Sequence, residues 1–235
     1  MLAIIGRGNV ASHLFTAFKD KMEIRLVNPH TLEDLPENPD VILLSVSDNA
    51  ISEVIEKLPD KGCVVAHTSG SIPMDVFKGK YNKYGVFYPL QTFTKETELN
   101  YREIPVFIEG NEDEVRADLK KLASLFSDNV KEADSEIRKK LHLASVFVCN
   151  FTNALMGIGE ELIDKTPVDK SDLLPLVNQT IKKLNMMSPK EAQTGPAVRG
   201  DSKVIESHLS MLEEKPDYQK LYSIFTDIIY KSSHQ

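Results

Sequence analysis

Three small residues near the N-terminus have the spacing of a phosphate-binding turn. Gly6, Gly8 and Ala11 follow the apolar run Leu2–Ile5 and precede an amphipathic segment. In this pattern the first glycine permits a tight turn, the second lets backbone amides approach a pyrophosphate, and the alanine lets helix and strand pack closely. The helix N-terminus adds free N–H groups and a positive dipole end. The pattern favours a dinucleotide site over a plain strand-to-helix turn, with candidate residues Gly6, Arg7, Gly8, Asn9, Val10 and Ala11.

The end of the second expected strand bears on cofactor choice. NAD enzymes usually place Asp or Glu about 20 residues after the glycine turn, where it binds the ribose 2′-hydroxyl. This chain has Asn28 there, 28 − 6 = 22 residues after the first glycine. Asn28 would not repel a 2′-phosphate, although it can also be a simple turn residue. Since Arg7 and His30 lie nearby as candidates to bind that phosphate, with Arg25 and Thr31 as weaker ones, we predict NADP(H) in preference to NAD(H).

Polar and small residues also follow the later strands. In an open parallel sheet, ligands bind beyond the carboxyl ends of the strands, so these loops are expected to meet at one edge. Asp48 and Asn49 could serve there or could cap the next helix. Tyr88–Thr92 should close the same crevice. The expected cofactor contacts at this edge are Val46, Ser47, Thr68 and Ser69, with Gln91 as a substrate contact.

An apolar helix in the second half carries an unusual polar face. His142, Ser145, Cys149 and Asn153 are separated by 3, 4 and 4 residues, which places them on one side of a helix. One interpretation is a catalytic face, with His142 as general acid while Asn150, Asn153 and Ser69 orient the substrate. The other is a helix–helix interface whose polar groups bond to one another.

A turn-rich segment lies further along the chain. Thr194 and Gly195 could donate hydrogen bonds to a substrate, and Arg199 could bind a carboxylate with two parallel hydrogen bonds. Arg199 could equally form a structural ion pair. Asp201 is best explained as the N-cap of the helix that follows it.

The pattern of elements changes once along the chain. Strand-like and helical segments alternate up to about residue 133, which predicts an α/β fold with a doubly wound, mostly parallel sheet of the Rossmann type. Beyond that point only helices are expected, the first of them over 136–164. We therefore predict a dinucleotide-binding domain at 1–133 and a helical domain for substrate binding and dimerisation at 134–235. The expected strands are 2–5, 24–28, 40–46, 63–67, 85–88, 105–108 and 130–132.

Composition narrows the class of protein further. Of the 235 residues, 41% are hydrophobic and 27% are charged, which is ordinary for a globular protein and excludes a disordered or collagen-like chain. The charge of 28 − 35 = −7 argues against a dedicated nucleic-acid binder. Cys63 and Cys149 have no CxxC partner, so we predict no metal site and expect reduced thiols. Leu2 already begins a strand and no apolar run approaches roughly 20 residues, so we expect a cytoplasmic protein without a signal peptide or membrane partner.

Taken together, five motifs resemble one family. The chain resembles the uncharacterised Rossmann-like family that carries domain of unknown function 2520 at its C-terminus. Its layout is more distantly similar to pyrroline-5-carboxylate reductase and to the 6-phosphogluconate-dehydrogenase-like group. The motifs that carry the resemblance are Ile5–Ala11, His67–Ser71, Tyr88–Phe93, Phe147–Asn153 and Thr194–Asp201.

The resemblance implies an NAD(P)-dependent oxidoreductase, and in the wider group the helical domain often makes the dimer, but the resemblance does not supply a substrate. We predict hydride transfer to or from a small carbonyl, hydroxy or imino compound, and a homodimer. Two departures from the relatives stand out. The hydroxyacid-dehydrogenase branch has Lys and Asn one turn apart on its interdomain helix, whereas here Leu143 follows Lys139 and Ala144 follows Lys140. The reductase's glycine-and-threonine loop is replaced by Thr194–Pro196. An alternative therefore stays open, namely a non-catalytic dinucleotide sensor or assembly protein that works as a homodimer.

Overall fold

The computed structural model describes residues 1–234, and its contacts divide the chain into two compact units. The first, Met1–Asn150, is called the α/β unit below. The second, Phe151–Gln235, is called the helical unit. Each is described by itself.

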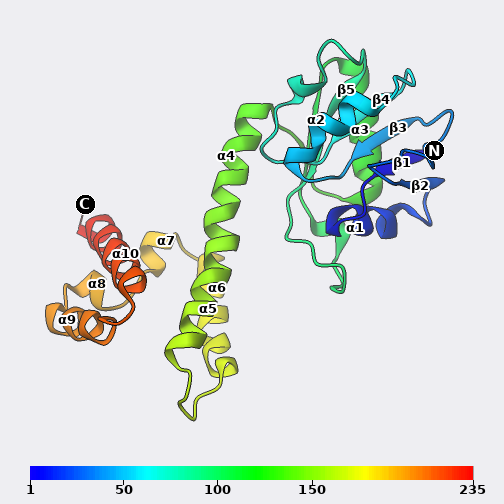
Figure 1. Ribbon diagram of the computed structural model, residues 1–235. Helices are drawn as coiled ribbons and strands as arrows, with labels where there is room; N and C mark the ends of the chain where they lie inside the picture. Colours follow the sequence, from blue (N-terminus) through cyan, green and yellow to red (C-terminus); the bar gives the residue numbers. More distant parts are fainter. Residues whose placement is uncertain (235) are drawn as a thin grey trace. The chain divides into compact units, whose positions relative to one another are not determined.

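A seven-stranded sheet forms the centre of the α/β unit, with strand order β2-β1-β3-β4-β5-β6-β7. Figure 1 labels the first five strands of the chain. Five of the six neighbouring pairs are parallel, and β5 and β6 are antiparallel. The predicted Rossmann-like, mostly parallel sheet is therefore confirmed. The strands are β1 (Leu2–Ile5), β2 (Ile24–Val27), β3 (Val41–Leu44), β4 (Val64–His67), β5 (Tyr84–Pro89), β6 (Val106–Gly110) and β7 (Val130–Glu132).

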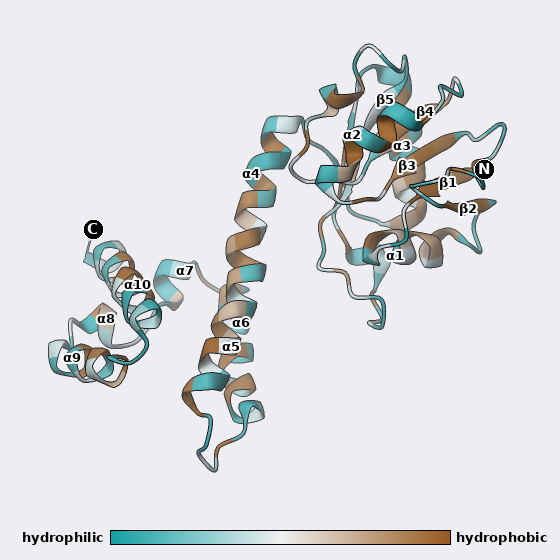
Figure 2. Ribbon diagram, viewed as in Figure 1, coloured by the Kyte–Doolittle hydropathy of each residue, from teal (hydrophilic) through white to brown (hydrophobic). Residues whose placement is uncertain are grey.

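Alternate residues of the inner strands feed two separate cores, because successive side chains in a strand point to opposite faces. Leu2 and Ile4 of β1 join a core with helices α1 (Asn9–Phe18) and α3 (Asp113–Phe126). Ala3 and Ile5 join the other core, with α2 (Asp48–Lys57) and the 3₁₀ turn η1 (Met74–Phe77). Burial on both faces explains why β1 and β3 are continuous apolar runs (Figure 2).

The order of the strands creates a switch point beside β1. Ile5 is paired with Val27 of β2 on one side and with Leu44 of β3 on the other, so three parallel strands end at the same edge. Gly6 turns away there with φ +145°, and a Cβ on it would lie 2.1 Å from the carbonyl oxygen of Ser45. This close approach excludes any side chain at Gly6, as the glycine pattern predicts.

One long helix leaves the α/β region. It consists of α4 (Ser135–Ser145), a π-helical segment η3 (Val146–Phe151) and α5 (Thr152–Leu162), a run of 28 residues. The sequence predicts the helix but not its π segment. By length and composition alone this helix could cross a membrane, a property that the search for apolar runs did not anticipate.

The predicted domain boundary and the compact units fall at different places. The last strand ends at Glu132, beside the predicted boundary at residue 133, but the contacts divide the chain after Asn150. The difference arises because α4 packs against the sheet region and so belongs to the α/β unit, with Arg138 completely buried against Glu109. The boundary at 133 marks a change of secondary structure, whereas the division at 150 marks where packing changes.

The helical unit consists of helices and turns that bury little. Among its described residues, Ala197 and Leu212 are the buried hydrophobic side chains. Many large apolar side chains on α5, α6 and α10 are exposed instead. After α5, its elements are η4 (Lys170–Leu173), α6 (Leu174–Leu184), α7 (Pro189–Ala192), α8 (Pro196–Arg199), α9 (Ser202–Met211) and α10 (Pro216–His234).

Candidate functional site

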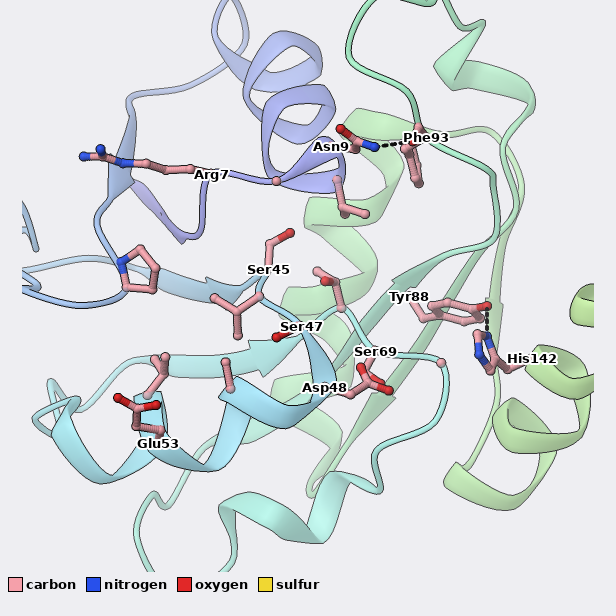
Figure 3. A pocket seen from close by; sticks show the side chains of 18 of the residues that line it. Arg7, Asn9, Ser45, Ser47, Asp48, Glu53, Ser69, Tyr88, Phe93 and His142 are labelled. Atoms are coloured by element: carbon pink, nitrogen blue, oxygen red, sulfur yellow. Dashed lines mark hydrogen bonds between the residues drawn. The ribbon is translucent and has the colours of Figure 1, made fainter. Parts of the chain in front are cut away.

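A cavity of about 590 Å³ lies at the carboxyl edge of the sheet, beside the switch point (Figure 3). It is lined by the glycine loop, by the loops after β2, β3 and β4, and by β5 and α4. This is the edge where ligands bind in open α/β sheets. The residues around it are Arg7, Gly8, Asn9, Val10, Pro29, His30, Ser45, Val46, Ser47, Asp48, Ala50, Glu53, Val54, Thr68, Ser69, Gly70, Tyr88, Gln91, Phe93 and His142.

The glycine loop leaves space at the start of α1. Gly8 is the N-cap of this helix, with φ −78°, and no side chain caps the first turn. A Cβ on Gly8 would meet no atom within 4 Å, so neither backbone conformation nor protein packing requires glycine here. The free N–H groups and the open space at Gly8 suit a pyrophosphate, which binds at helix N-termini.

The segment that follows β5 is hydrogen-bonded to the first turns of α1. Asn9 donates from its side-chain nitrogen to the carbonyl oxygen of Phe93 at 2.8 Å. One turn later, His13 is buried and lies 2.8 Å through Nε2 from the carbonyl oxygen of Thr94. The segment after β5 is thereby held against α1, and Phe93 comes to line the cavity.

One end of the cavity carries the basic groups predicted near the ribose. Arg7 and His30 line it together with Pro29, and Glu53 from α2 lies at the same end (Figure 3). The Glu53 carboxylate is paired with Lys57 at 2.6 Å, and this lysine lowers the pKa of Glu53, with a smaller contribution from His30. Asn28 does not line the cavity. Its Oδ1 accepts from the backbone N–H of His30 at 3.0 Å, so it shapes the turn that presents His30.

A buried hydroxyl lies in the middle of the cavity wall. Ser45 follows β3 and is 6% exposed, and its Oγ makes no hydrogen bond within the described chain. Buried polar groups normally have partners. Its presence on the wall therefore fits a polar ligand at this point. The sequence analysis did not single out Ser45, because it continues an apolar strand.

The opposite end brings together a tyrosine and a histidine from distant segments. The hydroxyl oxygen of Tyr88 on β5 lies 3.1 Å from Nδ1 of His142 on α4 (Figure 3). Tyr88 is 8% exposed, and burial raises its pKa, so the hydroxyl stays protonated near neutral pH. His142 is half-buried and lines the same cavity as the glycine loop.

The loop after β4 is held by its own serine. Ser69 Oγ accepts from the backbone N–H groups of Ser71 and Ile72, both at 3.0 Å. Those two bonds occupy the oxygen as an acceptor, and the Ser69 O–H remains as a donor toward the cavity. The expected cofactor contacts Val46, Ser47 and Thr68 line the wall beside it, and Gln91 is also on the lining.

A buried ion pair holds the start of α4. Arg138 has no exposed side-chain area and lies 3.1 Å through Nη2 from Oε2 of Glu109, and it also donates to the carbonyl oxygen of Ile72 at 2.9 Å. Ser135 donates to the same carboxylate at 2.8 Å, and Asp134 caps the helix by accepting from the N–H of Ile137. Because His142 follows Arg138 by four residues, the two side chains lie on the same face of α4. The contacts of Arg138 therefore fix the position of His142 relative to the sheet.

The comparisons with known proteins agree with this geometry. Residues 104–229 match the family model described as Domain of unknown function (DUF2520). The chain is 36% identical in sequence to the "putative NADP oxidoreductase BF3122" from Bacteroides fragilis, whose crystal structure matches with a TM-score of 0.88. The match covers 98% of this chain and 97% of that one. The chain belongs to the DUF2520 family. The resemblance found in the sequence is therefore confirmed.

More distant structures share the fold of this family member. An imine reductase from Myxococcus stipitatus in complex with NADP⁺ matches with a TM-score of 0.64 at 14% sequence identity. The match covers 99% of this chain and 93% of the reductase chain. A 1-pyrroline-5-carboxylate reductase from Streptococcus pyogenes has a TM-score of 0.58 at 15% identity, with coverage of 100% and 98%. No protein of curated function matches the chain in sequence.

Several predicted residues of this DUF2520 protein lie away from the cavity. Gly6 and Ala11 are buried and serve the turn and the packing of α1. Asn150 is exposed in the π segment. Four others belong to the helical unit and do not line this cavity, namely Asn153, Thr194, Gly195 and Arg199.

Two structural details concern the polar groups outside the cavity. Arg199 pairs with Asp201, with Nη2 2.6 Å from Oδ2, which matches the ion-pair alternative. Asp201 stands at the N-cap position of α9, but its side chain does not cap the helix. Within residues 1–234 no group of three or more His, Cys, Asp or Glu residues could hold a metal ion.

Proposed function

We propose that this protein is an NADP(H)-dependent oxidoreductase that transfers hydride to or from a small carbonyl, hydroxy or imino compound. One observation carries the proposal: the open space at Gly8, at the free N-terminus of α1, lies in the same cavity as His142. A dinucleotide bound by the glycine loop would extend along the switch point toward that histidine. The names of the similar structures, which include an NADP oxidoreductase and an imine reductase with NADP⁺, support the same class.

The proposed preference for NADP(H) rests on the basic end of the cavity. Arg7 and His30 line it, and no acidic residue stands at position 28 to bind a 2′-hydroxyl. The carboxylate of Glu53 is already paired with Lys57. Binding of NADPH and NADH can be compared by calorimetry in the wild type and in Asn28→Asp. The substitution should weaken NADPH and leave NADH unchanged or tighter, and an equal effect on both cofactors would contradict the assignment.

His142 is the proposed proton donor in the reductive direction. When bound, the nicotinamide cofactor supplies the hydride, and the protein must supply a proton from a group within hydrogen-bond reach of the substrate. Ser47, Ser69 and Gln91 are polar groups around the same cavity that can orient a substrate. Asn150, Asn153, Thr194, Gly195 and Arg199 stay proposed substrate contacts.

The test is oxidation of NADPH against a panel of small ketones, aldehydes and cyclic imines. His142→Ala should lower turnover by roughly 10²–10⁴-fold while NADPH binding is kept. Turnover that is unchanged in this variant would remove the role of His142. Tight NADPH binding with no turnover on any substrate, together with a change of oligomeric state on binding, would favour the dinucleotide sensor instead.

We further propose that the protein is a homodimer, formed through α4 and the helical unit. In the helical unit, Leu176, Met186 and Met211 are 68%, 81% and 79% exposed. In the α/β unit, the exposed large apolar side chains lie on the long helix, with the exception of Leu125. The rest of the α/β unit therefore offers no apolar face to cover them, whereas a second copy presents the same apolar helices. Large apolar surfaces of this kind mark interfaces.

Light scattering on the purified protein tests the dimer. The mass should be twice 26.4 kDa, and Leu176→Glu should return it to the monomer value. Gln179→Glu adds the same charge to an exposed polar position of α6 and should leave the dimer intact. A wild-type protein that stays monomeric would contradict the proposal.

A cytoplasmic location fits the packing of the long helix. Its first 11 residues, α4, pack on the α/β unit through Arg138 and His142, which leaves 28 − 11 = 17 residues of the helix. Roughly 20 are needed to cross a bilayer. Cell fractionation should recover the protein in the soluble fraction, and recovery in the membrane pellet after a salt wash would contradict this.

A further inference from the structure

A hydroxyl group from the sheet holds one nitrogen of the His142 ring. Tyr88 Oη lies 3.1 Å from Nδ1, and the two rings meet edge to face with centroids 6.2 Å apart. Within the described residues, Nε2 of His142 makes no hydrogen bond to the protein. The two nitrogens of the ring therefore have different surroundings: Nδ1 is engaged by Tyr88, and Nε2 is available to a ligand.

Space for this contact depends on a glycine in the loop after β4. A Cβ on Gly70 would lie 2.6 Å from Nδ1 of His142 and 2.8 Å from Cζ of Tyr88. Its φ does not lie in the left-handed region, so the backbone conformation alone does not require glycine. What requires glycine is the pair of rings packed against this loop.

The two supporting elements are themselves fixed. Tyr88 lies on β5, which is paired on both sides, with β4 and with β6. His142 lies one turn after Arg138, whose guanidinium is buried against Glu109. Ser145, three residues after His142, donates from its hydroxyl to the backbone carbonyl oxygen of His142 at 2.7 Å. Neither ring can move without disturbing a buried contact.

We infer that Tyr88 is a positioning residue for His142, and that Gly70 leaves the room that both rings need. Because Tyr88 occupies Nδ1, Nε2 is the atom that exchanges a proton with the substrate. The inference rests on the proposed oxidoreductase function. A phenol is suited to this role because its oxygen can accept from the Nδ1–H group both when the imidazole is charged and after Nε2 has lost its proton.

The proton balance is simple in the reductive direction. The N–H bond at Nε2 of the charged imidazole breaks, its electron pair stays on Nε2, and an O–H or N–H bond forms on the product. The ring becomes neutral with its remaining proton on Nδ1, where the Tyr88 oxygen accepts from it, and Tyr88 neither gains nor loses a proton. In the oxidative direction Nε2 takes the proton back.

The contact can be tested without a substrate. Full-length protein labelled with ¹⁵N in its six histidines would be studied by long-range ¹H–¹⁵N correlation, with His142→Gln to assign the signals. The neutral ring of His142 should carry its proton on Nδ1, with the Tyr88 oxygen as the hydrogen-bond acceptor, and Tyr88→Phe should change these signals alone among the six. A neutral ring protonated on Nε2 in the wild type, or identical signals in Tyr88→Phe, would overturn the inference.

Kinetics with the first substrate found then tests the role. Tyr88→Phe should lower kcat about tenfold, which is the loss expected for one hydrogen bond, and leave KM and the Kd for NADPH unchanged. Gly70→Ala should lower kcat at least as much. Tyr84→Phe, on the same strand but outside the cavity, is the matched control. Equal kcat in the wild type and both tyrosine variants would overturn the inference.

The outcomes separate this inference from the proposed function. If NADPH does not bind, the oxidoreductase proposal fails, and the histidine spectra still report whether Tyr88 holds Nδ1. If NADPH binds and is oxidised but kcat in Tyr88→Phe is unchanged, the oxidoreductase proposal stands and the positioning role of Tyr88 is wrong.

Discussion

The two units of this protein reach stability in different ways. In the α/β unit, side chains from both faces of one sheet enter two continuous cores, and Leu2, Ile4, Leu43 and Phe87 are completely buried. In the helical unit, Ala197 and Leu212 are the buried hydrophobic residues among those described. A sheet covered on both faces is complete within one chain, whereas amphipathic helices need a partner surface. The cavity proposed to bind the cofactor lies in the α/β unit.

The largest expected effect concerns the core of the α/β unit. Leu43→Ala removes a fully buried side chain from β3 and should lower the free energy of unfolding by about 2–5 kcal/mol. Leu176→Ala removes an equal volume from an exposed position of α6, and its effect should depend on protein concentration if it acts on the proposed dimer. Urea unfolding of both variants at two concentrations measures this. A concentration-independent loss of the same size in both would erase the contrast between the units.

The next effect concerns the cofactor and should be confined to the α/β unit. Arg7→Ala removes a basic group from the cavity end and should raise the Kd for NADPH about 10- to 100-fold, as for loss of a charged hydrogen bond. Arg199→Ala, in the helical unit, should leave it unchanged. Calorimetric titration of the two variants distinguishes them. An equal loss in both would mean that the helical unit shares the phosphate site.

A smaller effect concerns acid. Burial lowers the pKa of His67 to about 3, below the ordinary 6.5, with a further contribution from Arg138. The unfolded chain therefore binds more protons between these values, so stability is full above about pH 6.5 and falls as the pH drops toward 3. From pH 7.5 to 5.5 the loss from His67 should be about 1 kcal/mol.

The acid effect is isolated by comparison with His67→Asn. The asparagine can still accept from the N–H of Ser69, as Nδ1 of His67 does at 3.2 Å, but it does not titrate. Urea unfolding of both proteins at the two pH values gives the difference. An equal loss of stability in wild type and variant would show that His67 does not cause it.

The smallest effect concerns the start of α4. Asp134 accepts from the N–H of Ile137 at 2.8 Å, and Asp134→Ala should cost about 1 kcal/mol. Asp134→Asn keeps an acceptor and should cost less. Thermal unfolding compares the two, and an equal loss would indicate a role for the charge of Asp134 rather than for the cap.

The sequence predicted much of the sheet and one end of the site. Continuous apolar runs predicted β1, β3 and β4, because such runs are typical of strands buried on both faces. The glycine loop was predicted because its pattern is local in the sequence. Gly6 must be glycine because a side chain there would collide with the carbonyl oxygen of Ser45, whereas no contact within the protein requires glycine at position 8.

The other end of the site could not be predicted in full, because it depends on contacts between distant segments. His142 was recognised from its helical face, but Tyr88 is 54 residues away and was expected only to close the crevice. In the sequence Gly70 looks like an ordinary turn residue, and only the structure shows that the rings of Tyr88 and His142 pack against it. Arg138 looks like a surface charge in the sequence and is buried because Glu109 lies opposite it.

The central claim is that the space at Gly8 holds the pyrophosphate of NADP(H), and Gly8→Ala tests it most directly. The variant should keep the wild-type thermal midpoint, because φ −78° suits any residue and the added Cβ meets no atom within 4 Å. Calorimetry should show NADPH binding to the wild type and a Kd at least about tenfold weaker in the variant. A wild type that binds neither NADPH nor NADH, or a variant that binds NADPH as tightly as the wild type, would contradict the account.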